Sequence, residues 1–159
     1  MTLYDWLLFL HVLAAFALVA AIVVYDFVIV SSRRWSLPAE VVRGFRIARV
    51  GDVLVRVGAV GTLVFGVWVA LKEDVYGFGD AWIIIALVLW FAIGALGARS
   101  DKIYAPVKAR ARELEAAGRD EPSPELVAML RSPAAVGVNA VISVLLLLLL
   151  LDMIFKPGS

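Results

Sequence analysis

The sequence predicts an all-α, polytopic membrane protein: a four-helix bundle that forms a single domain over residues 1–159. Two observations carry this prediction. Hydrophobic residues make up 63% of the chain, whereas about half is usual for a soluble domain. They are gathered in four long blocks, and a helix needs roughly 20 mainly apolar residues to cross a hydrocarbon core about 30 Å thick. Lipid offers no partners to backbone groups, so such spans are helices.

Each block has the length of one span. The first carries Asp26 near its end, the second carries Asp52 and Arg56 in its first turns, and the third carries no charge. The fourth contains the leucine run 145–151. The predicted spans are residues 6–30, 50–71, 81–98 and 133–155, and the long connections are residues 31–49 and 99–132.

The first long connection carries the signals of a helix start. Ser36 is a capping residue, Pro38 an early proline and Glu40 an early acidic residue. Apolar residues and arginines then follow on opposite sides. We expect an amphipathic helix that is continuous with the second span and contacts anionic lipid head groups.

The second long connection is also expected to be helical. An apolar stripe continues the third helix beyond the membrane, and Gly118 is a plausible stop. Ser123-Pro124 starts a short helix that ends at Leu130, and Ser132-Pro133 starts the fourth span by the same device.

Basic residues set the predicted orientation, because cytoplasmic loops are enriched in lysine and arginine. Five lie in the first long connection and seven in the second, out of 15 in the chain. Lys72 and Lys156 fall on the other side. We therefore expect both termini outside and the amphipathic extensions in the cytoplasm. The first helix has no basic n-region, so we expect an uncleaved first span.

Composition and motifs exclude several function classes. The chain has no cysteine, which excludes disulfides, thiolate metal sites and cysteine nucleophiles. A formal net charge of +1 gives no case for nucleic-acid binding. The sequence has no P-loop, no G-x-S-x-G and no H-E-x-x-H.

Charged residues within the spans are candidate functional residues, because they are expensive in lipid. Asp52 and Arg56 are spaced i, i+4 and share a helix face. Asp26 would lie at similar depth if the first two helices are antiparallel neighbours. We expect an Asp26–Asp52–Arg56 cluster. It would be a charge-neutralising pair that fixes packing, a proton or ion path, or a site for head groups or a ligand.

Small residues recur on the second helix at Gly58, Thr62 and Gly66. This spacing lets another helix approach closely. The sequence leaves two partners open, the first helix or a second copy of the chain, and a homodimer is expected.

His11 is the only histidine of the chain. It lies roughly 9 Å from the outer end of the first span, at 1.5 Å per residue. Neutral imidazole is a common metal ligand and an axial ligand of haem iron. Met153 and Lys72 are expected on the same side and are candidate companions. The alternative is a histidine hydrogen-bonded to another helix. Asp152, on this side too, is expected to be solvated.

Several features together resemble an uncharacterised bacterial family of predicted integral membrane proteins. They are the run Leu10-His11-Val12-Leu13, a second helix rich in small residues, an aromatic-rich turn ending in Trp82, and a charged extension of the third helix. That family looks like a distant relative of HemJ-type protoporphyrinogen oxidases and CopD-like membrane domains.

This resemblance implies a four-helix bundle that holds a b-type haem or porphyrin near His11. A first-helix histidine and a downstream lysine characterise the HemJ-like proteins. Only His11 matches by position, and Lys72 and Lys102 are the nearest candidates for the lysine. The CopD-like domains would instead imply copper.

Three functions follow as hypotheses. The first is a haem-binding membrane protein that exchanges electrons with a quinone or a cytochrome, or oxidises a porphyrin. The second is a non-catalytic scaffold or accessory subunit in which His11 is structural. The third is a small dimeric proton-coupled transporter that uses Asp26, Asp52 and Arg56. Whether the protein is an enzyme is left open.

Overall fold

The structure, a computed structural model, describes residues 2–72 and 79–157. These ranges contain five helices and no strand: α1 (Leu3–Ser32), α2 (Pro38–Lys72), α3 (Ala81–Ala116), α4 (Pro124–Leu130) and α5 (Pro133–Phe155). Helices α1, α2 and α3 and the segment Pro124–Phe155 are each long and apolar enough to cross a membrane. The all-α, four-span prediction is therefore confirmed.

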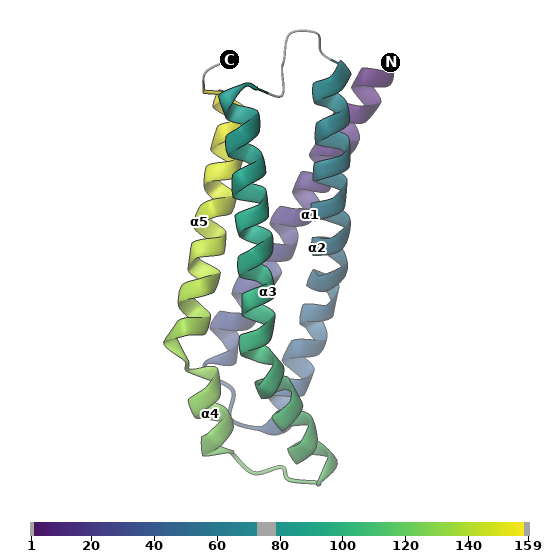
Figure 1. The fold of residues 1–159 in the computed structure, drawn as a ribbon. Coiled ribbons are helices and arrows are strands. Elements are labelled where there is room, and N and C mark those ends of the chain that lie inside the picture. The colour runs from purple at the N-terminus through teal and green to yellow at the C-terminus, as the bar shows by residue number, and fades with distance from the viewer. Residues whose placement is uncertain (1, 73–78, 158–159) are drawn as a thin grey trace.

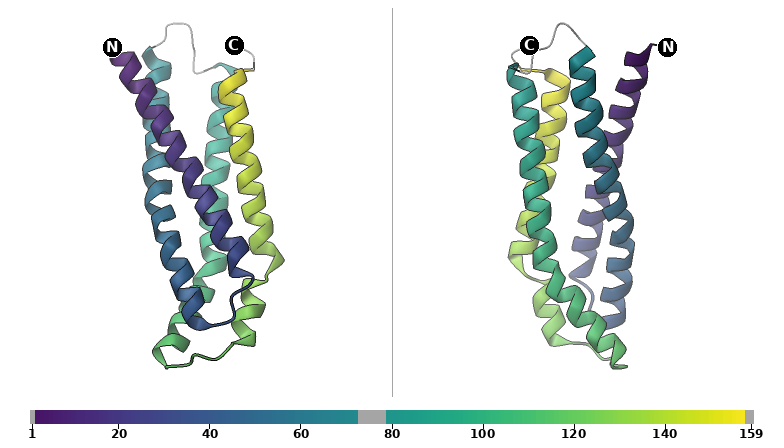
Figure 2. Two further views of the ribbon diagram at one scale, coloured as in Figure 1. Left: turned by 180° about the vertical axis from the view of Figure 1, so that it is seen from behind. Right: turned by 45° about the vertical axis from the view of Figure 1, so that its right-hand side comes forward.

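The four long helices run alongside one another, and both termini lie at one end of the bundle (Figure 1). We call this the terminal end, and we call the opposite end, where α4 lies, the α4 end. Helix α1 packs mainly against α2, and α3 packs mainly against α5. Seen from behind, α1 runs obliquely from beside α2 at the terminal end towards α5 at the α4 end (Figure 2).

The helical extensions form as the local signals indicate. Helix α2 begins at Pro38 and runs without a break through the second span. The Glu40 carboxylate accepts hydrogen bonds from the backbone N–H groups of Ser36 (2.9 Å) and Leu37 (3.1 Å). Because the first N–H groups of a helix have no partner within it, this side chain stabilises the start of α2.

Helix α3 also continues far beyond its predicted span, to Ala116. Gly118 follows with a φ of +67°, a left-handed conformation that suits glycine after a helix end. The helix bends in its second half (Figure 1), the half that contains Pro106. Proline lacks an N–H and its ring displaces the preceding turn, which accounts for a bend.

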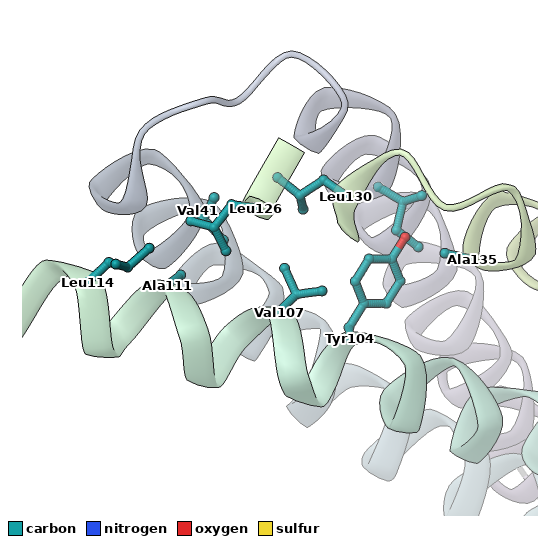
Figure 3. Close-up of a cluster of buried hydrophobic side chains, with 9 residues drawn as sticks. Val41, Tyr104, Val107, Ala111, Leu114, Leu126, Leu130 and Ala135 are labelled. Atoms are coloured by element: carbon teal, nitrogen blue, oxygen red, sulfur yellow. The ribbon is translucent and has the colours of Figure 1, made fainter. Parts of the chain in front are cut away.

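Two clusters of buried apolar residues hold the bundle together. One lies at the α4 end, where all five helices contribute to it (Figure 3). The other joins α1, α3 and α5 within the spans. The first consists of Ile29, Val41, Tyr104, Val107, Ala111, Leu114, Leu126, Leu130 and Ala135. The second consists of Leu18, Ile22, Ala86, Ile93, Ile142, Leu146 and Leu149.

Candidate functional site

His11 lies in the interface between α1 and α2. Its Nδ1 donates a hydrogen bond to the backbone carbonyl oxygen of Thr62, 3.1 Å away. A carbonyl oxygen can only accept, so the proton sits on Nδ1 and the lone pair of the neutral ring on Nε2. Nε2 has no hydrogen-bond partner among the described residues and is not one of the fully buried nitrogen atoms.

The imidazole fills a space that a glycine leaves open on α2. A Cβ atom at Gly66 would lie 2.9 Å from Cε1 and 3.1 Å from Nδ1 of His11. The orientation of the ring is therefore fixed by one hydrogen bond and by direct contact with the backbone of α2. The alternative that the sequence leaves open for His11, a hydrogen bond to another helix, is therefore present in the structure.

The small-residue face of α2 is covered by α1 of the same chain. A Cβ atom at Gly58 would lie 2.6 Å from the backbone nitrogen of Leu18. The Thr62 hydroxyl donates to the carbonyl of Gly58 at 2.7 Å, within its own helix. Of the two partners that the sequence left open, the structure selects the first helix. A homodimer would have to use a different face.

The candidate companions of His11 lie elsewhere. Met153 of α5 packs against the buried cluster within the spans, and Lys72 is exposed at the end of α2. Over residues 2–72 and 79–157, no group of three or more histidine, cysteine, aspartate or glutamate residues could hold a metal ion. His11 therefore has a ring held through Nδ1 and an Nε2 atom without a hydrogen-bond partner in the described part of the chain.

The charged residues of the first two spans are separated into two hydrogen-bonded groups. Asp26 turns towards α5, where its carboxylate accepts hydrogen bonds from the Asn139 amide and from the Ser143 hydroxyl, the latter at 2.8 Å. Asp52 of α2 accepts a hydrogen bond from the hydroxyl of Tyr25. Since Tyr25 and Asp26 are neighbours in sequence, adjacent side chains of α1 tie it to two different helices.

Arg56 forms no ion pair with either group in the described part of the chain, although its charge acts on Tyr25. Its side chain is exposed, and no ion pair links it to Asp52 within the described ranges. The structure thus does not bring Asp26, Asp52 and Arg56 together as one cluster. A long side chain near a span end can extend to the polar head groups, which fits the exposure of Arg56.

The expectation that Asp152 is solvated is wrong. This residue is only 7% exposed, and neither carboxylate oxygen has a hydrogen-bond partner among the described residues. It lies in the last turn of α5 beside a groove between α3 and α5 that Ile85, Leu89 and Leu148 help to line. The negative end of a helix dipole makes this an unfavourable place for a carboxylate.

Sequence reasoning missed the partners of both aspartates, Tyr25, Asn139 and Ser143. Asn139 and Ser143 are spaced i, i+4 on an otherwise apolar helix. Polar side chains in such a span are expected to bond across to a neighbour, so this spacing was the available signal. The partner could not be read from it, because Asp26 is 113 residues from Asn139.

Comparison with known proteins identifies a family. The family described as "Predicted integral membrane protein (DUF2269)" matches residues 5–157. Neither the curated proteins nor the solved structures include a match.

Proposed function

The chain belongs to this family of predicted integral membrane proteins, and on that premise we propose that it binds a b-type haem through Nε2 of His11. The observation that carries the proposal is the hydrogen bond from His11 Nδ1 to the carbonyl of Thr62. Histidines that bind metals commonly donate their other ring N–H to a carbonyl or carboxylate, which fixes the tautomer and the ring. In His11, Nδ1 makes this hydrogen bond, so Nε2 is the nitrogen that would bind the iron.

The depth of His11 also supports the proposal. It lies in the half of the bundle nearer the terminal end, several turns from Asp26 and Asp52. A cofactor there would sit within the lipid-facing part of the protein, apart from both carboxylates. A bound haem would supply one-electron transfer to or from a quinone or a cytochrome, or oxidation of a porphyrin. His11 would hold it, and Thr62 and Gly66 would orient His11.

His11 is the one residue of this chain that we propose as a haem ligand. The chain has one histidine. Met153 packs against the buried cluster within the spans, and Lys72 is exposed at the end of α2. A second copy of the chain could offer another His11. Within a single chain, His11 alone would hold the haem.

We also propose that the terminal end faces outside and the α4 end lies in the cytoplasm of a bacterial cell, in its inner membrane. The basic residues support this orientation, because 12 of the 15 lie in the two long connections, residues 31–49 and 99–132. The haem would then lie in the outer half of the membrane.

The test is an absorption spectrum of the full chain, purified in detergent, titrated with haemin and then reduced. We expect the wild type to gain a Soret band at one haem per chain and His11→Ala to lose it. Met153→Leu is the matched control and should keep the band. A wild-type protein that stays colourless, or a His11→Ala variant with an unchanged spectrum, would overturn the proposal.

The second candidate is a scaffold in which His11 is purely structural. The contact of the imidazole with Gly66 favours it, because a side chain packed this closely already serves the α1–α2 interface. In that case no haem binds, and His11→Gln keeps the thermal stability of the wild type. The absorption titration and the melting curve together separate the two candidates.

A further inference from the structure

Four basic side chains from two helices line one small cavity at the α4 end. Arg46 and Arg49 come from the first half of α2, and Lys108 and Arg112 come from the second half of α3. The cavity has a volume of about 60 Å³, whereas roughly 10–15 Å³ of such space is enough for one water. It therefore has room for a small polar group beneath four positive charges.

Most of this charge is not neutralised within the protein. Lys108 forms an ion pair with Asp101 at 3.0 Å. Over residues 2–72 and 79–157, Arg46, Arg49 and Arg112 form none. Like charges gathered around one cavity repel one another, so an anion that enters it is stabilised.

A neighbouring arginine shows the contrast. Arg110 of α3 lies within 3.2 Å of Glu113 and 3.0 Å of Glu125, and the two carboxylates raise its pKa. The chain thus provides carboxylate partners for Arg110, while the arginines of the cavity are left to solvent or to a ligand.

The wall of the cavity is rigid and apolar. Val41 and Ala111, both fully buried, line it and belong to the packed cluster at the α4 end (Figure 3). Phe45 also lines it, with its ring centroid 5.5 Å from that of Tyr104 and 5.8 Å from Lys108 Nζ. Because the helices are packed against each other here, the backbone positions of the four basic residues are fixed around one site.

We propose that this cavity binds a phosphate group, either in the head group of an anionic phospholipid or in a soluble phosphorylated compound. Guanidinium groups match phosphate oxygens through paired hydrogen bonds. The level in the bundle fits a lipid, since Arg49 directly precedes the second predicted span, and basic pockets between helices bind lipid head groups in other proteins. The apolar wall suits the glycerol and upper acyl carbons that accompany such a head group.

The experiment measures the melting temperature of the delipidated full chain in detergent with three probes. These are short-chain phosphatidylglycerol, short-chain phosphatidylcholine and inorganic phosphate. A ligand that binds only the folded state raises the melting temperature with its concentration. We expect phosphatidylglycerol to raise it and phosphatidylcholine not to. A rise with inorganic phosphate as well would identify free phosphate as a ligand, and no rise with it would identify the lipid; both support the proposal.

Variants connect the effect to the cavity. Arg49→Gln and Arg112→Gln, on different helices, should each weaken the apparent affinity for phosphatidylglycerol roughly tenfold, which is typical of removing one charged hydrogen bond. Arg43→Gln is the matched control, because Arg43 is exposed on the same helix but does not line the cavity. It should leave the affinity unchanged.

Two results would overturn the proposal. One is the absence of any rise in melting temperature with either anionic probe. The other is an equal loss of affinity in Arg43→Gln and in the two cavity variants, which would assign the effect to general surface charge. Arg49→Lys, which keeps the charge, replaces Arg49→Gln if that variant fails to fold. We expect Arg49→Lys to bind phosphatidylglycerol more weakly than the wild type does.

Discussion

The Nδ1 atom of His11 lies 3.1 Å from the backbone carbonyl oxygen of Thr62, 51 residues further along the chain. One contact thus ties α1 to α2 and determines which nitrogen of the only histidine remains available. Gly66, one turn beyond Thr62, leaves the space in which the ring lies.

The first prediction concerns that space. In Gly66→Ala the new Cβ would lie 2.9 Å from Cε1 of the ring, so the imidazole must shift and its hydrogen bond weakens. We expect the free energy of unfolding to fall by about 1–3 kcal/mol, as in other overpacked sites. Gly97→Ala on α3, where nothing lies within 4 Å, should be neutral or slightly stabilising. Equal melting temperatures for the two variants would contradict the prediction.

The second prediction concerns the link from α1 to α5. A double-mutant cycle of Asp26→Ala and Ser143→Ala should show a coupling of about 0.6 kcal/mol, and up to about 1.7 kcal/mol, the range measured for hydrogen bonds between membrane helices. The measurement is the free energy of unfolding in detergent. Asp52→Ala with Ser143→Ala is the control pair and should be additive, since Asp52 bonds to Tyr25 instead. Strict additivity in both cycles would mean that the Asp26–Ser143 bond contributes nothing.

The third prediction concerns Asp152. Both of its carboxylate oxygens are buried without partners in the described part of the chain, and each such group costs about 1–3 kcal/mol. We expect Asp152→Leu to raise the melting temperature, because it removes that cost and adds apolar contact in the groove. Asp120→Leu, at an exposed site, should leave it nearly unchanged. A lower melting temperature for Asp152→Leu would show that the carboxylate is stabilising.

The fourth prediction concerns Tyr104 at the α4 end. Its ring is buried in the cluster, and its hydroxyl has no partner among the described residues. Burial raises the pKa of this hydroxyl, and Arg33 partly opposes the shift. Tyr104→Phe should therefore keep the stability or raise it by about 1 kcal/mol, whereas Tyr104→Ala should lose about 3–5 kcal/mol. Thermal unfolding of both variants checks this, and a similar loss in each would reveal a hidden partner for the hydroxyl.

The fifth prediction is a pH dependence from Glu40. The N–H groups of Ser36 and Leu37 hold the pKa of its carboxyl below the usual value. A folded-state pKa below the unfolded one means that the stabilisation is complete above the unfolded pKa and is lost as pH falls through the folded one. We expect the melting temperature of Glu40→Gln to lie below that of the wild type near neutral pH and to converge with it in acid. A constant gap across that range would argue against the cap.

The sequence predicted the spans and the helix starts because both depend on local features. Apolar blocks of sufficient length must become helices in lipid, and the signals at Ser36, Ser123 and Gly118 act on the neighbouring backbone alone. The continuation of α2 and α3 beyond the membrane followed from the same local periodicity. The four-span, all-α class is confirmed, and helices begin at Pro38, Pro124 and Pro133. Ser123 caps its helix through its side chain, whereas Ser132 forms no side-chain cap hydrogen bond and Ser36 contributes its backbone N–H.

What the sequence could not decide is which side chains meet across helices. Similar depth in the membrane predicts that Asp26 and Asp52 meet, but depth does not determine how a helix is rotated about its axis. Tyr25 and Asp26, which are neighbours on α1, point to α2 and α5 respectively. The place of Asp152 near a span end predicts a solvated carboxylate, yet the packing of α3 and α5 buries it. Only the tertiary structure fixed the rotation of each helix, because that depends on how small residues such as Gly58 and Gly66 let the backbones approach.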